Sequence, residues 1–188
     1  MKKLFSEIPE LTGDRLTLKQ LTQADAGALR ELTDDDEVYR YLPTFLFEKQ
    51  YDDKSYVIER LYDECLKSSL ILGVYIEGEF CGLAEIYGYR AALRKASVGY
   101  RLIRRYWGRG IATETHGLLV KYLLEDTDVE TVTASTMAEN EASNKVLKKN
   151  GFKFAGHTVL ENWGYAKPIL TDKWIRTGIG YRLQYKFQ

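Results

Sequence analysis

The stretch of this chain best suited to chemistry is the turn RYWGRG at residues 105–110, between a predicted strand and a predicted helix. A turn that feeds straight into a helix leaves the first backbone N–H groups of that helix unpaired and directed at one point. Gly108 and Gly110 have no Cβ, so a ligand can approach the backbone, and the helix dipole adds about half a positive charge. The two glycines and the free N–H groups, with Arg105 and Arg109 beside them, predict a cradle for a phosphate group. An ordinary turn with surface arginines is the plainer alternative.

Two other phosphate-binding motifs are excluded by the residues present. A Walker loop requires a Lys followed by Ser or Thr directly after its second glycine, and these glycines have no such neighbours. A dinucleotide-binding turn requires a third glycine at a position that Thr113 occupies. The predicted anion is therefore neither the phosphate chain of a P-loop nucleotide nor the pyrophosphate of a Rossmann dinucleotide.

A second motif, NEASNKVLKKNGF, occupies residues 140–152. The first turn, with Ala112 after it, has the pattern R-x-x-G-x-G followed by a small residue, and it resembles the acetyl-CoA pyrophosphate loop of the GNAT superfamily of N-acetyltransferases. The second motif has the pattern N-x-x-S followed by G-F, and it resembles a helix of the RimJ/RimL-like branch, which acetylates ribosomal proteins. Because two separate motifs occur in the order of that family, we identify the chain by resemblance as a RimJ/RimL-like GNAT protein.

The resemblance implies an acetyl-CoA-dependent N-acetyltransferase that moves an acetyl group from the thioester to a primary amine within a ternary complex. The amine would belong to a protein N-terminus or to a small molecule. Backbone groups of the strand before the turn would contact the pantetheine arm, the turn would hold the pyrophosphate, and two asparagines would lie near the arm. The residues so assigned are Leu102, Ile103, Arg105, Gly108, Arg109, Gly110, Ile111, Ala112, Thr113, Asn140 and Asn144.

Attack of an amine on a thioester releases a thiolate, which needs a proton or a positive field. Many GNAT enzymes carry a tyrosine four residues before the glycine that ends the motif helix, but this chain has Leu147 there. The resemblance assigns the role instead to Ser143 of the N-x-x-S pattern. The alternative is a serine in the first turn of a helix that bonds only to its own backbone.

Two carboxylates compete as the base that removes a proton from the amine. Glu161 aligns with the glutamate that the RimL-like branch is thought to use, and Glu85 lies in a predicted strand among apolar neighbours, where either catalysis or a buried ion pair would account for it. Ser97 stands where other GNAT enzymes keep a glutamate, so the choice stays open. His157 shares the alternation of Glu161 and is a third candidate, as a relay, although a lone strand histidine is more often structural.

Hydrophobic periodicity predicts the strands and helices that must position these residues. They predict an α/β (α+β) protein: a mixed, mostly antiparallel sheet of about seven strands flanked by four helices, the arrangement of the GNAT fold, in one domain covering residues 1–188. The predicted strands are 15–19, 70–76, 80–87, 96–103, 130–135, 152–160 and 173–187. The predicted helices begin near residues 22 and 53 and cover 111–124 and 140–151.

The composition of the chain limits the classes of partner that it is expected to bind. The formal net charge is zero, with 27 basic and 27 acidic residues, which argues against a strong nonspecific grip on nucleic acid. Cys65 and Cys81 lack metal-type spacing and form no disulfide framework, so no metal is predicted and a reduced, cytoplasmic protein is the simple inference. No apolar run is long enough to span a membrane. The sequence leaves a homodimer open.

Two further questions stay open at this stage. Trp163, Tyr165 and Trp174 are predicted to edge the acceptor groove, where aromatic faces can hold a cation, but they do not identify the amine. The competing function is a GNAT-fold protein that binds acyl-CoA as a sensor or scaffold without catalysis. The missing tyrosine at position 147 and the serine at position 97 both leave room for that alternative.

Overall fold

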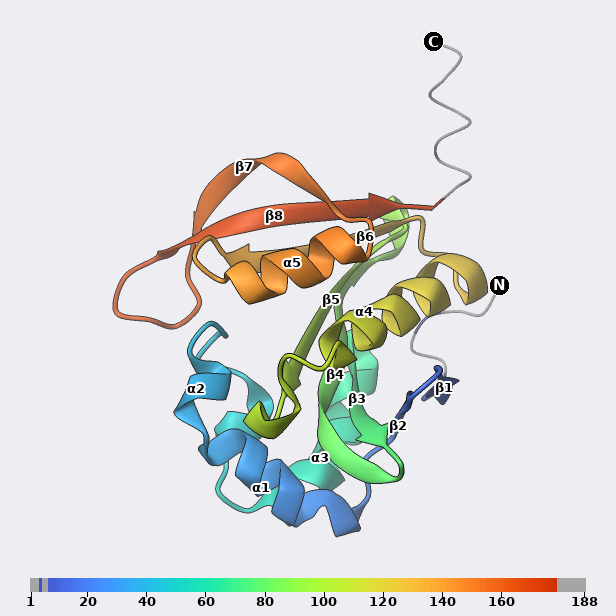
Figure 1. Cartoon of the computed structure of the whole chain (residues 1–188), viewed down its shortest axis with the longest axis vertical. Helices are drawn as coiled ribbons and strands as arrows, with labels where there is room; N and C mark the ends of the chain where they lie inside the picture. The colour runs from blue at the N-terminus through green and yellow to red at the C-terminus, as the bar shows by residue number, and fades with distance from the viewer. Residues whose placement is uncertain (1–3, 5–6, 179–188) are drawn as a thin grey trace.

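The computed structural model describes Leu4 and residues 7–178, and its centre is one twisted sheet of eight strands (Figure 1). The strands are β1 (Leu11–Thr12), β2 (Leu16–Lys19), β3 (Ser69–Ile76), β4 (Glu79–Arg90), β5 (Lys95–Leu102), β6 (Thr131–Met137), β7 (Lys153–Glu161) and β8 (Ile169–Thr177). The α-helices are α1 (Ala26–Asp34), α2 (Asp36–Tyr39), α3 (Lys54–Ser68), α4 (Ile111–Lys121) and α5 (Glu141–Lys149).

The strands follow the order β1-β2-β3-β4-β5-β6-β8-β7, and every neighbouring pair is antiparallel except β5 and β6. The mixed, mostly antiparallel α/β class is therefore confirmed. The numbers of elements differ slightly from those predicted, with eight strands and five α-helices in the described part of the chain. The additional elements are the two-residue β1 and the one-turn α2, which are too short to produce a periodic sequence pattern.

The predicted end of the sheet needs correction. The last described strand, β8, begins at Ile169 and ends at Thr177, whereas the sequence predicted 173–187. Its early start comes from pairing on both sides, because Ile169 is opposite Glu161 of β7 and Thr171 is opposite Met137 of β6. The predicted apolar face formed by residues 181, 183, 185 and 187 lies outside the described residues.

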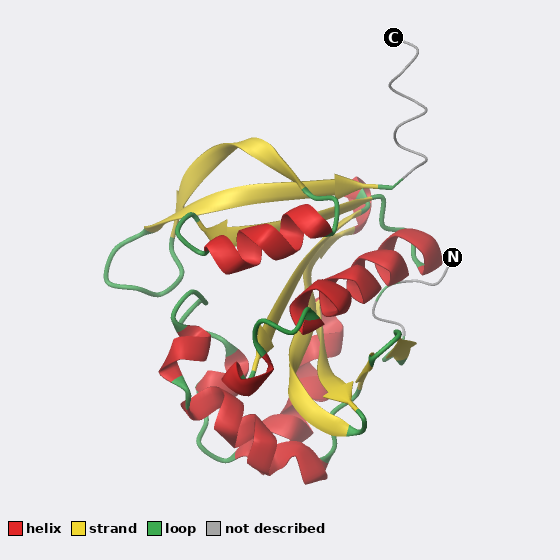
Figure 2. Cartoon of the chain, viewed as in Figure 1, coloured by secondary structure: helices red, strands yellow, loops and turns green. Residues whose placement is uncertain are grey.

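The parallel pair β5 and β6 separates soon after it begins. Only three registered positions join the two strands, and the last of these places Ser97 opposite Thr133. Beyond that point β5 stays paired with β4 as far as Leu102, and β6 stays paired with β8 as far as Met137. The two strands therefore open into a gap whose sides are each held by another partner (Figure 2).

Two helices border this gap because each follows one of its strands. Helix α4 comes after β5 and packs on β2, β4 and β5, while α5 comes after β6 and packs beside α4. Helices α1 and α3 pack on each other and on β4, and α3 also packs on β3. The side chains buried most completely between these layers include Leu18, Leu29, Leu61, Leu72, Leu83, Ile86, Leu119 and Leu123.

A histidine lies inside this core. The His116 side chain of α4 is 2% exposed and packs between the rings of Tyr100 and Phe152, with ring centroids 5.3 and 5.7 Å away. Neither ring nitrogen has a hydrogen-bond partner among the described residues. Burial, with a smaller effect from the charge of Arg176, lowers the pKa of His116 to about 4. The imidazole is therefore neutral in the folded protein at physiological pH.

We predict that His116 makes the folded protein sensitive to acid. Its folded pKa lies below the unfolded value, so its contribution to stability is complete above about pH 6.5 and is lost as the pH falls toward 4. Wild type should lose about 2 kcal/mol more than His116→Leu between about pH 7.5 and pH 5, measured by urea unfolding. Equal losses in the two proteins would contradict the buried neutral imidazole.

Candidate active site

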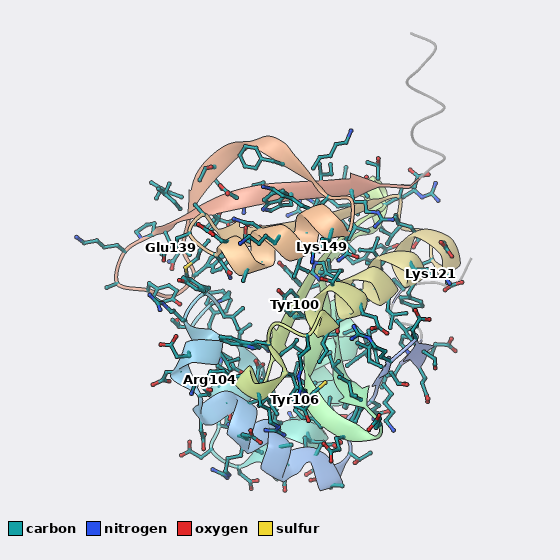
Figure 3. The ribbon with its side chains drawn as sticks, in the orientation of Figure 1. Tyr100, Arg104, Tyr106, Lys121, Glu139 and Lys149 are labelled. Carbon is teal, nitrogen blue, oxygen red and sulfur yellow. The ribbon has the colours of Figure 1, made fainter. Side chains whose placement is uncertain are left out.

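The gap between β5 and β6 opens into a cavity of about 790 Å³. Its floor comes from β4 and β5, one wall from α2 and the loop that follows it, and the other wall from α4, β6 and α5. Both sequence motifs reach it, through Gly108 and Gly110 on one side and through Asn140 and Ser143 on the other. Figure 3 shows the two sides, with Arg104 and Tyr106 near the start of α4 and Glu139 just before α5.

The cavity gathers most, but not all, of the residues that the sequence assigned to the site. Those that line it are Leu102, Gly108, Gly110, Ile111, Ala112, Thr113, Asn140, Ser143, Glu85 and Glu161. Those that the sequence assigned but that do not line it are Ile103, Arg105, Arg109 and Asn144. The glycines, the first turn of α4 and the start of α5 therefore face a common space, while the arginine side chains do not.

The turn before α4 has the backbone geometry that an anion cradle requires. Gly108 and Gly110 have φ angles of 73° and 80°, in the left-handed region that favours glycine. Gly110 is the N-cap of α4, and no side chain caps this helix. The first backbone N–H that forms a hydrogen bond of the helix is that of Glu114, which donates to the Gly110 carbonyl at 3.1 Å. The amides of residues 111–113 are thus free to bind a ligand.

The arginines of the turn are held by acidic side chains of the first two helices. Arg105 forms an ion pair with Glu31 of α1, and Arg104 Nε lies 3.0 Å from the Asp35 carboxylate. Both guanidinium groups are about half exposed. In the structure these ion pairs therefore attach the turn to α1 and to the junction between α1 and α2.

A further arginine beside the turn, Arg15, is one that sequence reasoning missed. Arg15 donates from its amide and from Nε to the two carboxylate oxygens of Glu114, at 2.8 and 2.9 Å, and from Nη1 to the Arg109 carbonyl at 3.1 Å. A Cβ added to Gly110 would lie 3.3 Å from Arg15 Nη2. No local pattern could reveal this contact, because Arg15 precedes Glu114 by 99 positions.

The backbone of β5 offers the gap a free edge. The Ile103 amide donates to the Cys81 carbonyl at 2.9 Å and its carbonyl accepts from the Tyr106 amide at 3.0 Å, so both of its backbone groups are engaged. Strand alternation then turns the N–H and C=O groups of Leu102 and Tyr100 toward the gap. The Leu102 carbonyl accepts there from Trp107 Nε1 at 2.8 Å. Of the two predicted backbone contacts, Leu102 has a favourable orientation and Ile103 does not.

The start of α5 is fixed by its own cap. Asn140 is the N-cap, and its Oδ1 accepts from the Ser143 amide at 3.1 Å. Asn144 points elsewhere, because its Oδ1 accepts from Thr136 Oγ1 at 2.7 Å and its side-chain nitrogen donates to the Ala138 carbonyl. Asn144 therefore attaches α5 to the end of β6, and Asn140 remains the asparagine that faces the cavity.

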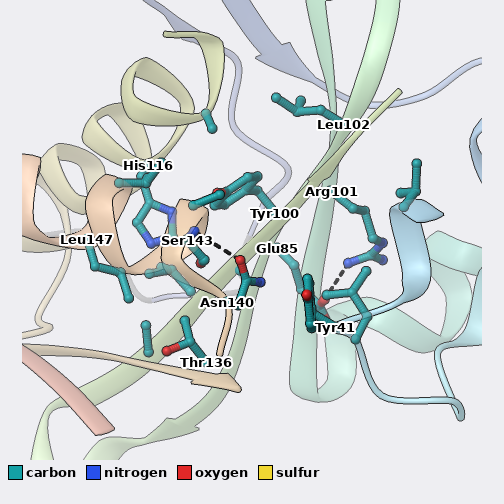
Figure 4. Close-up of a pocket in the computed structure, with 18 of the residues that line it drawn as sticks. Tyr41, Glu85, Tyr100, Arg101, Leu102, His116, Thr136, Asn140, Ser143 and Leu147 are labelled. Atoms are coloured by element: carbon teal, nitrogen blue, oxygen red, sulfur yellow. Dashed lines mark hydrogen bonds and ion pairs between the residues drawn. The ribbon is translucent and has the colours of Figure 1, made fainter. Parts of the chain in front are cut away.

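Ser143 faces a tyrosine that the sequence analysis did not single out (Figure 4). Tyr100 extends from β5 into the same cavity, and its ring packs edge-on against His116. Burial raises the pKa of the Tyr100 phenol, and the neighbouring Ser143 hydroxyl opposes this effect. Leu147, in the place of the missing tyrosine, is fully buried one turn further along α5. The only sequence signal at position 100 is strand alternation, which does not distinguish a site residue from a packing residue.

Glu85 belongs to a buried charge network under the cavity floor. Arg101 donates from Nη1 to Glu85 Oε2 at 2.9 Å, and its Nε lies 2.6 Å from Glu48 Oε1. Tyr39 donates to the same Glu48 oxygen at 3.1 Å. Burial lowers the pKa of Arg101, but the two carboxylates outweigh burial and raise it, so the guanidinium stays charged. A buried ion pair thus explains a glutamate in an apolar strand, and Glu85 also faces the cavity.

Glu161, at the end of β7, has more partners than Glu85. Its Oε2 lies 2.5 Å from Lys173 Nζ and accepts from Thr171 Oγ1 at 2.9 Å and from Trp163 Nε1 at 3.1 Å. Burial raises the pKa of the Glu161 carboxyl, but these three donors together bring it below its ordinary value. The carboxylate is therefore ionised and firmly oriented at the cavity wall, and a lowered pKa weakens it as a base.

The remaining predicted neighbours separate into three groups. Ser97 shares a 2.8 Å hydrogen bond with Thr133 at the last rung of the β5–β6 pair, so it has a structural role. The side chain of His157 is outside the described part of the chain. Of the three aromatic residues predicted to edge the groove, Trp163 lines the cavity. Trp174 is only 4% exposed and donates to Thr136 Oγ1, so its predicted place at the edge is wrong.

In residues 4 and 7–178, no group of three or more His, Cys, Asp and Glu side chains could hold a metal ion. None of the helices in that part of the chain is both long and apolar enough to cross a membrane.

Residues 15–153 match the family model of the acetyltransferase (GNAT) domain. The uncharacterized N-acetyltransferase YoaA of Bacillus subtilis (strain 168) is 31% identical over 161 residues, which cover 84% of this chain and 89% of that protein. Two solved structures share the fold. RimL, a ribosomal L7/L12 α-N-protein acetyltransferase in complex with coenzyme A, has a TM-score of 0.76 at 16% identity, over 90% of this chain and 98% of RimL.

The second structure is Mycobacterium smegmatis RimJ in complex with CoA-disulfide, with a TM-score of 0.75 at 20% identity. It covers 90% of this chain and 86% of RimJ. The family match extends over most of the sequence and contains both the glycine turn and the whole of the second motif. The chain therefore belongs to the GNAT family of acetyltransferases.

Proposed function

We propose that this protein transfers an acetyl group from acetyl-CoA to a primary amine by direct attack within a ternary complex, in one domain that spans the chain. The observation that carries the proposal is the meeting of three features in one cavity. These are the free first-turn amides of α4, the free edge of β5, and the start of α5 with Ser143. RimL and RimJ, whose solved structures contain coenzyme A or CoA-disulfide, share this fold and support the same branch.

The pyrophosphate of the cofactor would lie on the α4 turn. Gly108, Gly110 and the amides of residues 111–113 supply hydrogen-bond donors at the positive end of a helix. The Arg15 guanidinium adds positive charge beside Gly110. The pantetheine arm would then follow β5, where the Leu102 amide and the Tyr100 backbone groups face the gap. This path brings the thioester to the start of α5.

Ser143 would donate a hydrogen bond to the sulfur as the thiolate leaves. The positive end of the α5 dipole is directed at the same place, so it also stabilises the developing negative charge. The Asn140 cap holds the backbone of this turn and thereby fixes the position of the Ser143 side chain. Both contributions are strongest after the C–S bond begins to break, which is what a catalytic interaction requires.

The two carboxylates, Glu85 and Glu161, would have different roles toward the amine. Glu85 has one oxygen bound by Arg101 and lies on the floor, so we assign it the uptake of the amine proton, directly or through water. Glu161, whose charge is held by Lys173, would attract the incoming ammonium group. An α-amino group with a pKa near 7.8 is neutral in roughly a tenth of molecules at pH 7, against about one in 2,500 for a lysine side chain. A weak base is sufficient for the former.

The aromatic and apolar residues of the cavity wall formed by α2 and the loop after it would contact the acceptor. Tyr41, Leu42 and Phe45 from the loop after α2 line the cavity opposite Trp163. The two sides touch, because the Thr44 amide donates to the Trp163 carbonyl at 2.8 Å. An amine carried on an apolar or aromatic neighbour fits this wall, whether it is a protein N-terminus or a small molecule.

We predict that the purified chain releases thiol from acetyl-CoA when a panel of peptide and small-molecule amines is added. Ser143→Ala should lower kcat about 10- to 100-fold, and Glu85→Gln should lower it more than Glu161→Gln does, because Glu85 is assigned the proton transfer. Thiol release is measured with a disulfide reagent. Tight cofactor binding without turnover over the whole panel would favour the sensor alternative, and full rates in all three variants would remove the assigned roles.

We also predict that cofactor affinity depends on the glycine turn. Gly108→Ala should weaken acetyl-CoA binding about tenfold or more in calorimetry, because its Cβ and its disfavoured φ disturb the cradle. Gly78→Ala is a matched control at the β3–β4 turn, with φ of 85° and open space around an added Cβ, as at Gly108. Equal affinities in both variants would contradict the position of the pyrophosphate.

A further inference from the structure

Helix α5 offers the leaving thiolate no good proton donor. Leu147 cannot donate a proton, and Ser143 is a poor acid because an aliphatic hydroxyl ionises far less readily than a phenol or a thiol. A reference phenol has a pKa near 10 and a reference thiol near 8.5, so a phenol and a thiolate exchange a proton at modest cost. A phenol near the sulfur would supply the acid that α5 lacks.

Tyr100 places a phenol at this position from a different element. It lies on β5 three residues beyond Ser97, the last residue that pairs with β6, so it stands inside the gap. Its side chain is directed toward α4 and α5, with the ring against His116, and it lines the cavity together with Ser143 (Figure 4). The phenol of Tyr100 and the hydroxyl of Ser143 therefore line the same part of the cavity.

The surroundings of Tyr100 keep this phenol in a form that can donate. Its ring packs at 82° to the His116 imidazole, which fixes the ring plane. The imidazole is uncharged and has no partner among the described residues, so it does not draw the phenolic proton away. Burial disfavours the phenolate, so the hydroxyl carries its proton when the thiolate forms. Ser143, which lines the same cavity, is the residue already assigned to the sulfur.

We propose that Tyr100 is the general acid of the reaction and acts with Ser143 on the leaving sulfur. The amine nitrogen forms a bond to the thioester carbonyl carbon, and the C–S bond breaks with its electron pair passing to sulfur. The phenolic proton of Tyr100 passes to that sulfur, directly or through the Ser143 hydroxyl, and gives free coenzyme A thiol. Glu85 takes the proton lost by the acylated nitrogen, and a proton returns from Glu85 through water to the Tyr100 phenolate, so one proton leaves nitrogen and one arrives at sulfur. This inference rests on the proposed acetyl transfer.

The test compares Tyr100→Phe, Ser143→Ala and the double variant with wild type. Phenylalanine keeps the ring against His116, so only the hydroxyl is removed. We expect Tyr100→Phe to lower kcat about tenfold or more, with the calorimetric Kd for acetyl-CoA within about twofold of wild type. If the two hydroxyls serve one proton path, the double variant should be no more than about twofold slower than the slower single variant.

Tyr89→Phe is the matched control, because Tyr89 lies on the neighbouring strand β4, bonds to Asp128 and is absent from the cavity lining. It should retain the wild-type kcat. The proposal is overturned if Tyr100→Phe keeps full kcat, if it changes only the affinity for acetyl-CoA, if Tyr89→Phe is equally slow, or if the losses of the two single variants multiply. Absence of turnover in wild type would instead show that the proposed acetyl transfer itself fails.

Discussion

The separation of β5 from β6 is the constraint on which the site depends. Two parallel strands joined at only three positions would normally leave unpaired backbone groups inside the protein, and such groups are costly when buried without partners. The fold limits this cost by giving each strand a full antiparallel neighbour on its other side, β4 for β5 and β8 for β6. What remains is one free edge on β5 and one on β6, at the gap that opens into the cavity. A ligand with alternating amide groups can pair with such an edge as another strand would.

A buried charge network fixes the acceptor wall against this edge. Arg101 stands on β5 itself and links Glu85 of β4 to Glu48, which belongs to the segment after α2. Burying three charges contributes little net stability, because desolvation offsets most of the attraction. Their effect is better described as positional, since removal of one partner would leave an uncompensated charge in the interior. The loop that carries Tyr41 and Phe45 is thereby held in one place relative to the floor.

The parts of the site that the sequence predicted are those with a local cause. The glycines of the α4 turn require positive φ angles, and Asn140 caps the helix three residues before Ser143. Each of these features depends on a few consecutive residues, so a short pattern is sufficient to recognise it. The glycine-rich turn and the α5 motif consequently lie at the cavity as expected.

The parts that the sequence did not predict depend on contacts between distant positions. Arg15 reaches the α4 turn across 94 residues to Arg109, and Tyr100 meets Ser143 only because α5 folds back over β5. Trp174 was expected at the groove, but cross-strand neighbours on β6 bury it. Strand alternation gives the face of a residue but not what covers that face, which is decided by the tertiary packing.

Chain topology also explains why two anionic groups can be bound in one cavity. Helix α4 follows β5 and α5 follows β6, and because these two strands are parallel, their carboxyl ends point the same way. Both helices therefore begin at the same gap and direct the positive ends of their dipoles toward it. A diphosphate at α4 and a thiolate at α5 would each meet such an end. In the proposed reaction the fold would thus supply much of the electrostatic stabilisation through its backbone, and side chains such as Ser143 and Tyr100 would supply chiefly the proton.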